Sequence, residues 1–350
     1  MTARTARPTV GRPSSSEGPA LSALPGTPPT CPAGTRPARL LRVDRTAYDV
    51  LTEEGPLRLP ALPPPAEATV GDWLAVTADA VVAVLPRTSL LVRGSASGQS
   101  RSQPLAANVD VVLVCAALTA ALPVRRIERL VVLAWESGAT PVVVLTKADL
   151  ADDAAEAVRD LLPHTPGVDV VTVAAAQGEV AALAPYAVPG ATLVLLGASG
   201  TGKSTVVNAL AGGEVMPTGD VRHVDGKGRH TTTHRELVVL PSGAVVIDTP
   251  GLRGVALAGS EQGLARAFSD VEELAAACRF ADCAHVGEPG CAVQASLDAG
   301  DLSAARMASW RTLQRELDFQ ARRADARLRA EALRTWKIRT RANRARGARA

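Results

Sequence analysis

Apolar runs and helical patterns alternate through the middle of the chain. Short runs of Val, Leu, Ile and Ala, of the kind that form buried strands, are separated by longer amphipathic stretches. This alternation is typical of a parallel sheet flanked by helices, so we predict such a domain between Val109 and about Gly254. The expected elements are strands at 111–115, 142–145, 168–173, 193–196, 237–240 and 245–247, and helices near 124–136, near 152–162 and from Lys203.

The segments on either side of this domain have different patterns. Between about Leu40 and Leu105, short strand-like pieces are broken by turn sequences rich in Gly, Pro and Asp. Several short strands in such a segment fit a small barrel such as an OB-fold, and they fit a β-sandwich equally well. Beyond Ser260 the pattern is helical, apart from a loop rich in Cys and His.

Composition points to a soluble, cytoplasmic protein of two or three domains. The 350 residues are 47% hydrophobic, which allows sizeable cores. The longest apolar stretch, at 111–122, is too short to span a bilayer, so we expect no membrane partner. Residues 1–37 are rich in Pro and lack the pattern of a secretory signal, and we expect them to be a disordered head. The five cysteines therefore argue against a disulfide framework.

The net charge of +3 is unevenly distributed. Residues 306–349 contain 14 Lys or Arg and four acids, which leaves the rest of the chain acidic. A basic tail on an acidic body favours a polyanionic partner such as RNA, although a solvated helix face with a frayed end explains the same charges.

Residues 197–204 form a complete G-x-x-x-x-G-K-S phosphate-binding loop between an expected strand and an expected helix. Backbone N–H groups of such a loop turn inward, and the positive end of the helix adds to the field. Lys203 is expected to reach the β and γ phosphates, and the Ser204 hydroxyl to bind Mg²⁺. The predicted nucleotide-binding residues here are Gly197, Ala198, Ser199, Gly200, Thr201, Gly202, Lys203, Ser204 and Thr205.

A second phosphate motif follows the run at 245–247. Asp248 opens a D-T-P-G sequence, and its carboxylate is expected in the outer coordination shell of Mg²⁺. The N–H of Gly251, at the end of this sequence, is expected to lie near the γ phosphate. The segment 226–234 is rich in Gly and Thr and is suited to a mobile switch. One of its threonines at 231–233, for which we take Thr232, is expected to bind Mg²⁺. The same sequence is also compatible with an ordinary polar hairpin loop. Leu252 occupies the position where many GTPases have a glutamine that orients the attacking water. His230 is therefore the candidate to position this water; a purely structural role for His230 is the alternative.

A guanine-reading motif lies ahead of the phosphate loop, in the reverse of the order in ordinary small GTPases. Thr146, Lys147 and Asp149 belong to T-K-A-D at the end of an expected strand. The Asp149 carboxylate can accept hydrogen bonds from guanine N1 and the exocyclic amine, which adenine does not offer. Thr146 stands where Asn is usual, and its single hydroxyl is expected to weaken contact with guanine N7. The segment 174–178 is the weakest motif, a loop whose N–H groups could read guanine O6. The order of the motifs suggests a circularly permuted GTPase.

The Cys/His-rich loop has the spacing of a structural metal site. Cys278, Cys283, His285 and Cys291 offer three thiolates and one imidazole within 14 residues. Such a Cys3His set is typical of tetrahedral Zn²⁺ with no open position for chemistry, and the metal would supply much of the folding energy of so small a segment. Free buried cysteines beside a surface histidine are the alternative.

Together these residues resemble the RsgA (YjeQ) family of small-subunit-dependent GTPases. The resemblance spans roughly residues 38–340 in matching order. It is carried by 70–73 (V-G-D-W), 106–110 (A-A-N-V-D), 228–233 (G-R-H-T-T-T), 248–251 (D-T-P-G), 278–285 and 288–293.

The resemblance implies an α/β protein with an N-terminal OB-fold β-barrel, a central circularly permuted P-loop GTPase domain and a C-terminal helical zinc-binding domain. We expect domains at 38–105 (RNA-binding), 106–255 and 256–340, with a basic tail at 341–350. It also implies GTP or GDP, Mg²⁺ and one Zn²⁺ as ligands, and zinc ligation by the Cys3His set. In the family His230 corresponds to a proposed catalytic histidine.

The expected function is GTP hydrolysis stimulated by the small ribosomal subunit, late in its maturation and through rRNA binding. We expect a monomer with no DNA partner. Two alternatives remain from the sequence: an RNA-binding checkpoint protein in which nucleotide is only a ligand, and a P-loop ATPase or kinase in which T-K-A-D is coincidental.

Overall fold

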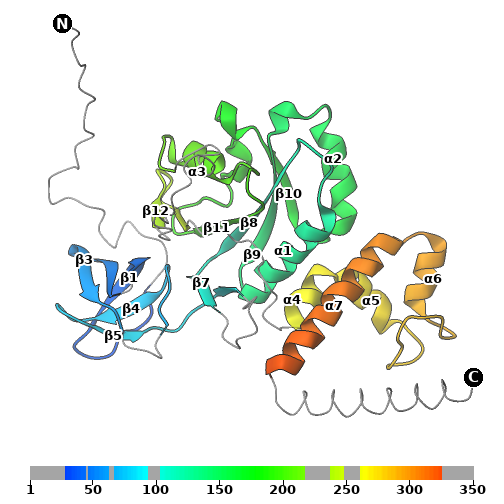
Figure 1. Cartoon of the computed structure of the whole chain (residues 1–350), viewed down its shortest axis with the longest axis horizontal. Coiled ribbons are helices and arrows are strands. Elements are labelled where there is room, and N and C mark those ends of the chain that lie inside the picture. The colour runs from blue at the N-terminus through cyan, green and yellow to red at the C-terminus, as the bar shows by residue number, and fades with distance from the viewer. Residues whose placement is uncertain are drawn as a thin grey trace, which may run out of the picture.

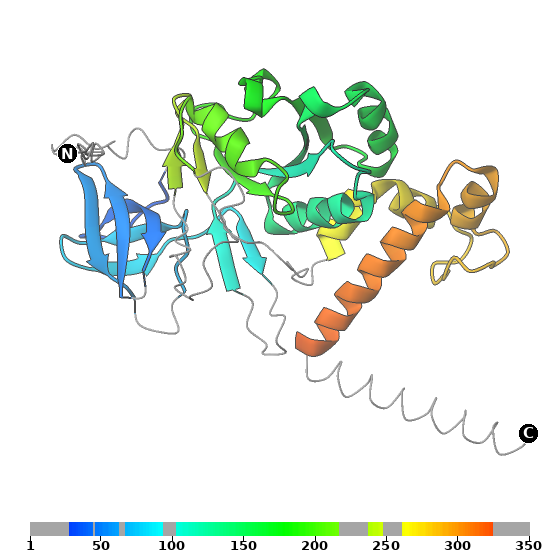
Figure 2. The same cartoon turned by 45° about the horizontal axis from the view of Figure 1, so that its top comes forward.

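A computed structural model describes residues 28–44, 46–62, 67–93, 103–216, 237–247 and 261–324. Three parts lie in a row: an N-terminal antiparallel sheet, a central α/β domain and a C-terminal group of helices (Figures 1 and 2). The sites expected at His230, Thr232, Asp248 and Gly251 lie outside the described residues, as do most of the Pro-rich head and the basic tail.

The N-terminal part is a five-stranded sheet in the order β3-β2-β1-β4-β5. All of its pairs are antiparallel, and it encloses a core of its own that includes Leu40, Val50, Leu59 and Leu74. The short strands expected from the sequence are present. Their bounds are β1 Arg36–Val43, β2 Ala47–Thr52, β3 Gly55–Pro60, β4 Trp73–Val76 and β5 Val81–Val84; a separate hairpin of β6 Leu90–Arg93 and β7 Gln103–Ala107 leads into the central domain.

The central domain is a six-stranded sheet in the order β10-β9-β8-β11-β13-β12. The expected parallel sheet is present across β10, β9, β8, β11 and β13. The expectation is wrong for the edge strand β12, which runs antiparallel to β13 because a short turn at 240–244 joins them as a hairpin. The strands are β8 Val111–Ala117, β9 Thr140–Thr146, β10 Asp169–Val173, β11 Thr192–Leu196, β12 Leu237–Val239 and β13 Val245–Ile247.

Helices cover both faces of this sheet, because alternate residues of each central strand point to opposite sides. In β8, Val112 and Val114 join one core together with helix α1 (Val124–Ser137), while Leu113 and Cys115 join a second core with helix α3 (Lys203–Ala211). Helix α2 (Ala154–Leu161) packs beside β10. Short 3-10 turns follow at η2 Ala148–Leu150, η3 Leu162–His164, η4 Ala175–Gln177 and η5 Ala181–Leu183.

The C-terminal helices are attached to the central domain through contacts with α1. They are α4 Glu261–Ala267, α5 Ser269–Ala276, α6 Ala292–Ala299 and α7 Ala304–Ala324. Helix α4 crosses α1 so closely that a Cβ on Gly263 would lie 2.7 Å from the Val132 carbonyl oxygen, so a glycine is needed at the crossing. In the described part of the chain, none of the helices combines the length and apolar character needed to cross a bilayer.

Candidate nucleotide site and metal centre

The phosphate-binding loop turns sharply at the end of β11. Gly197 has a φ of +156°, and a Cβ there would lie 2.5 Å from the Cys115 carbonyl oxygen on the neighbouring strand β8. Gly200 and Gly202 have φ of +80° each, a region that side chains rarely adopt. The loop therefore needs its glycines for this path, and it delivers the chain into α3 at Lys203.

Lys203 lies over the loop that it follows. Its Nζ donates hydrogen bonds to the carbonyl oxygens of Ala198 at 2.6 Å and Gly197 at 3.2 Å. The Thr201 hydroxyl donates to the Ala198 carbonyl at 2.9 Å. Gly202, which caps α3, has no side chain to accept from the first N–H groups of the helix, so these donors suit an anion. Ser199 is exposed, and Ser204 and Thr205 are half-buried in the first turn of α3.

Thr146 contacts the phosphate-binding loop. Its side chain is buried at the end of β9, and its hydroxyl lies 2.7 Å from the Thr201 carbonyl and 3.2 Å from the Ala116 carbonyl. The hydroxyl therefore ties the phosphate loop to two strands. The weakened contact between Thr146 and guanine N7 stays a prediction.

Lys147 and Asp149 follow in the loop after β9. Lys147 adopts φ of +58°, which turns the chain out of the strand and into η2, where Asp149 is exposed. The loop at 174–178 follows β10 and packs against α3 through η4. Because β9, β10 and β11 belong to one parallel set, these loops and the phosphate loop lie at the same edge of the sheet. The carboxyl edge of an open α/β sheet is where such folds bind ligands.

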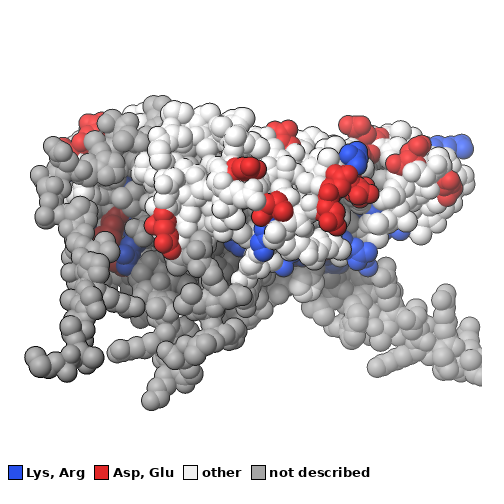
Figure 3. All heavy atoms as spheres, turned by 90° about the horizontal axis from the view of Figure 1, so that it is seen from above, with Lys and Arg blue, Asp and Glu red and all other residues white. Residues whose placement is uncertain are grey.

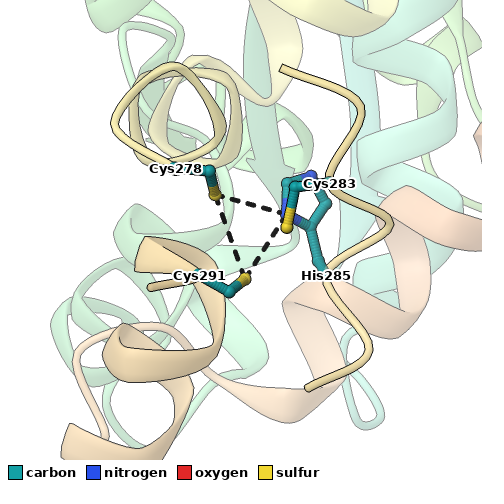
Figure 4. Close-up of side chains that lie close together, drawn as sticks. All are labelled: Cys278, Cys283, His285 and Cys291. Atoms are coloured by element: carbon teal, nitrogen blue, oxygen red, sulfur yellow. Dashed lines mark hydrogen bonds between the residues drawn. The ribbon is translucent and has the colours of Figure 1, made fainter. Parts of the chain in front are cut away.

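The predicted Cys3His set comes together in the C-terminal part (Figure 4). The ligand atoms of Cys278, Cys283, His285 and Cys291 all lie within 4.8 Å of one another. The Cys278 Sγ lies 3.9 Å from Cys291 Sγ and 3.5 Å from His285 Nδ1, and Cys291 Sγ lies 3.6 Å from that nitrogen. Tetrahedral zinc with Zn–S bonds of about 2.3 Å requires ligand separations of about 3.5–3.8 Å. The set therefore has the dimensions of a tetrahedral metal site.

The surrounding polar contacts hold these ligands in place. Desolvation raises the pKa of the Cys278 thiol, but N–H groups of Val293 and Ala292 at the start of α6, together with the Cys291 and Cys283 thiols, bring the pKa below its usual value. Desolvation and the neighbouring thiols raise the pKa of Cys283 to about 12. His285 has φ of +58° and its carbonyl accepts a 2.6 Å hydrogen bond from Arg311 on α7. The loop that carries the metal ligands, residues 278–291 (the metal loop), is thus joined to α7 by this hydrogen bond.

Comparison with known proteins identifies the family. A family model described as RsgA GTPase matches residues 84–258. The chain is 49% identical over 316 residues to the small ribosomal subunit biogenesis GTPase RsgA of Streptomyces avermitilis, covering 87% of this chain and 85% of that protein. It is 47% identical over 284 residues to the RsgA of Opitutus terrae, covering 77% of each chain. The chain belongs to the RsgA family of GTPases.

Solved structures agree with the RsgA fold. The crystal structure of YjeQ from Thermotoga maritima aligns with a TM-score of 0.61 at 24% identity, covering 81% of this chain and 98% of that one. YloQ, described as a circularly permuted GTPase, aligns with a TM-score of 0.60 at 22% identity, covering 82% of this chain and 96% of that one. These similarities support the fold, and membership of the RsgA family makes this chain a hydrolase that acts on GTP.

The chain also contains a buried polar contact between the N-terminal sheet and the central domain that the sequence did not predict. Arg39 on β1 is 1% exposed, lies 4.9 Å over the Trp73 ring, and donates to the Thr192 hydroxyl at 3.1 Å and the Asn108 carbonyl at 3.3 Å. Burial lowers its pKa to about 10. Asp72 in the V-G-D-W turn is also buried and receives two hydrogen bonds from Arg87. The resemblance of that turn to the family was the only signal.

A second unpredicted contact joins the central domain to the C-terminal helices. Arg306 on α7 is 2% exposed and donates to the Glu128 carboxylate on α1 at 3.0 Å and to the Asp270 carboxylate at 2.8 Å. It also donates to the His164 carbonyl at 2.7 Å and lies 3.8 Å from the Phe268 ring centre. Isolated charges in amphipathic patterns give no sign of such burial, and neither Arg39 nor Arg306 was singled out from the sequence.

Proposed function

We propose that this protein hydrolyses GTP while it is docked on the small ribosomal subunit, and that it acts late in the maturation of that subunit. The single observation that supports this most is the meeting of the phosphate loop and the T-K-A-D loop at one sheet edge, with Lys203 over the loop carbonyls. Relatives that share nearly half of its residues bear the name small ribosomal subunit biogenesis GTPase. We further propose a cytoplasmic monomer that binds rRNA.

The proposed domain roles follow the order of the chain. Residues 38–105 form an RNA-binding OB-fold, which is supported by the five antiparallel strands around a separate core. Residues 106–255 form the circularly permuted GTPase domain, in which the guanine-reading strand precedes the phosphate-loop strand. Residues 256–340 form the zinc-binding helical domain, supported by the spacing of the ligand atoms.

Guanine selectivity is assigned to Asp149. Its carboxylate accepts from guanine N1 and the exocyclic amine, and its exposure beside the end of β9 supports that role. Lys147 lies along the base, and Thr146 positions the phosphate loop through the Thr201 carbonyl. The N–H groups of the phosphate loop and the Lys203 ammonium bind the β and γ phosphates.

Hydrolysis requires groups from the switch segments as well. Ser204 and Thr232 would hold Mg²⁺ through their hydroxyls, with Asp248 in its outer shell; the ion would neutralise charge that develops on the phosphates. The Gly251 N–H donates to the γ phosphate. His230 orients the attacking water, because Leu252 at the position of the usual glutamine has no polar atom to do so.

The metal centre is proposed to hold one structural Zn²⁺. Cys278, Cys283, His285 and Cys291 saturate a tetrahedral ion, so the site contributes folding energy and leaves no position for a substrate. Its proposed role is to fix the metal loop against α7, where Arg311 already bonds the His285 carbonyl.

A nucleotide-dependent docking experiment tests the proposal. Purified small subunits are titrated with the protein in GTP, GDP or a non-hydrolysable GTP analogue, and bound protein is retained on a filter. We expect tight binding with the analogue and weaker binding with GDP. Asp149→Asn should shift nucleotide preference from guanine toward xanthine by on the order of 1–3 kcal/mol without changing docking once loaded. Equal binding of ATP and GTP by the unchanged protein would refute the assignment of Asp149, and absence of docking in every nucleotide would refute the partner.

A further inference from the structure

The V-G-D-W turn at 70–73 extends from the N-terminal part of the chain into the core of the central domain. Its two hydrophobic residues, Val70 and Trp73, are buried in the cluster that also contains Val245 and Ile247 of β13. The N-terminal sheet has a core of its own, and these two residues belong to the other one. The turn therefore packs as part of the GTPase domain, although β1 and β4 hold it in the N-terminal sheet.

Gly71 brings this turn into direct contact with β13. It has φ of +89°, and a Cβ there would lie 2.3 Å from the Ala107 carbonyl oxygen and 2.8 Å from Cδ1 of Ile247. Cβ atoms do not approach other atoms so closely, so a larger residue would have to move the turn or the strand. Ile247 is the last residue of β13, and Asp248 is the next residue of the chain. The turn thus lies against the residue that immediately precedes the D-T-P-G motif.

Hydrogen bonds hold the turn rigidly to its surroundings. The Gly71 N–H donates to the Leu40 carbonyl of β1, and the Gly71 carbonyl accepts from Nδ2 of Asn108, both at 2.9 Å. The Asp72 carboxylate is fully buried and accepts from Arg87 at 2.7 and 2.8 Å. A displacement of the N-terminal sheet is therefore passed on to Ile247 and is not absorbed within the turn.

The strand that receives this contact is short and lies beside the strand of the phosphate loop. Ile247 pairs with Val194 of β11, which ends at the phosphate loop. Arg39 of the N-terminal sheet bonds the Thr192 hydroxyl at the start of β11, so the sheet touches both strands. Close-packed interiors transmit small displacements, because few voids are present to take them up. The position of the N-terminal sheet and the position of β13 relative to β11 are thus linked.

Surface charge offers no comparable link on the face seen in Figure 3. There the Asp and Glu side chains of the described residues lie in separate groups, divided by uncharged surface. Exposed charges more than about 8 Å apart are largely screened at physiological ionic strength. Packing at Gly71 and Ile247 is therefore the connection that the described residues support.

We propose that Gly71 and Ile247 are positioning residues that set the preference of the protein for GTP over GDP, by fixing β13 relative to the phosphate loop. The inference rests on the proposed roles of Asp248 and Gly251 at Mg²⁺ and the γ phosphate. GDP lacks the γ phosphate, so a shifted β13 weakens binding of GTP and changes binding of GDP little. Coupling between two sites is reciprocal, so a partner that moves the N-terminal sheet changes GTP affinity through the same contact.

The test compares equilibrium affinities of the full-length protein for GDP and for a non-hydrolysable GTP analogue, with Mg²⁺ and without ribosomal subunits. Ile247→Val removes the Cδ1 atom that faces Gly71 and keeps the rest of the side chain. It should lower the preference for the analogue over GDP about 5-fold. Gly71→Ala forces the turn and β13 apart, and it should lower the preference further, toward the upper end of the range of about 5- to 150-fold that is typical of coupled sites.

Val245→Ala and Gly55→Ala are the matched controls. Val245 lies in the same strand and the same core cluster as Ile247, and alanine there removes two methyl groups where Ile247→Val removes one. A general loss of stability would therefore affect this control more than the variant. Gly55 in the N-terminal sheet has φ of +116° but no atom within 4 Å of an added Cβ. Both controls should keep the preference of the unchanged protein.

Amide hydrogen exchange gives the reciprocal measurement. In the unchanged protein the analogue should protect peptides from 67–76 more than GDP does, and Ile247→Val should reduce this difference. Preferences in Ile247→Val and Gly71→Ala that equal those of the controls would overturn the proposal, as would equal affinities of the unchanged protein for GDP and the analogue. Hydrolysis that small subunits fail to stimulate would refute the proposed function without altering these affinities, so the two failures are distinguishable.

Discussion

Replacing Arg306 by alanine should release the C-terminal helices from the central domain. Arg306 is the common partner of Glu128, Asp270 and two backbone carbonyls, and it is 2% exposed. Among the described residues, truncation leaves the buried Glu128 carboxylate with the Ser309 hydroxyl and the His164 ring as partners. Breaking a buried pair in this way costs about 3–5 kcal/mol, because one charge stays behind without its counter-ion.

Arg129 provides the matched control on the same two helices. It also pairs α1 with α7, but its side chain is 32% exposed and that of its partner Glu316 is 23% exposed. Solvent screening limits such a pair to about 0.2–1 kcal/mol. Arg306→Ala should therefore weaken the attachment of α7 several times more than Arg129→Ala does. Combining Glu128→Gln with Arg306→Met should recover part of the loss, since it removes a stranded charge as well as its partner.

Amide hydrogen exchange of peptides from α7, in the full-length protein, measures this difference. A cost of about 3–5 kcal/mol corresponds to faster exchange by roughly 10²- to 10⁴-fold in Arg306→Ala, against less than about tenfold in Arg129→Ala. Peptides from β8 and β9 should keep their protection in both variants. Equal exchange of α7 in the two single variants would refute the view that Arg306 is the main attachment.

The remaining predictions concern the phosphate loop, the metal centre and the tyrosines. Gly197→Ala should abolish nucleotide binding in an equilibrium titration, because its Cβ would lie 2.5 Å from a backbone oxygen. Gly200→Ala, at a residue with positive φ but no atom within 4 Å of the added Cβ, should lose little affinity. Equal losses of affinity in the two variants would contradict the role of the close contact. Metal analysis should find one Zn²⁺ per chain, and purified protein without zinc would contradict the assignment of the metal centre. Cys283→Ser should make the C-terminal helices more susceptible to proteolysis while leaving GTP affinity unchanged. Burial raises the pKa of Tyr48, and burial with a hydrogen bond to Asp169 raises that of Tyr186 to about 12. Both folded pKa values lie above the unfolded value, so this stabilisation is complete below about pH 10 and is lost as the pH rises further, up to about pH 12 for Tyr186. Absorbance titration of the folded protein should show little tyrosinate at pH 10, where the unfolded chain is half ionised.

Much of the central domain was predictable because its signals are local. Runs such as 142–145 and 193–196 are apolar on both faces, which indicates buried parallel strands, and a phosphate loop with fixed spacing marks the edge where ligands bind. The spacing of the Cys3His set correctly predicted that the four ligand side chains lie together. A short loop brings such ligands together regardless of how the rest of the chain folds. The direction of β12 was not predictable, since three residues carry no information on pairing.

The contacts between the parts of the chain were not predictable for a different reason. Arg39 and Arg306 are charged residues among polar neighbours, and local pattern assigns such residues to the surface. Their burial depends on partners more than 60 residues away, Asn108 for one and Glu128 for the other. The role of Thr146 was likewise hidden, because its acceptor on the phosphate loop is 55 residues away. The predicted base contact of Thr146 therefore stays a prediction beside its observed contact with the loop.

The rate of GTP hydrolysis with and without small ribosomal subunits tests the central claim most directly. Single-turnover hydrolysis should be slow for the protein alone and faster by about 10³- to 10⁵-fold on saturating small subunits, the range for a catalytic group that is supplied or ordered by a partner. His230→Ala should dock in the presence of the GTP analogue yet lose the stimulation. An unchanged stimulated rate in that variant would remove His230 from the mechanism. A rate that small subunits do not alter in the unchanged protein would contradict the account as a whole.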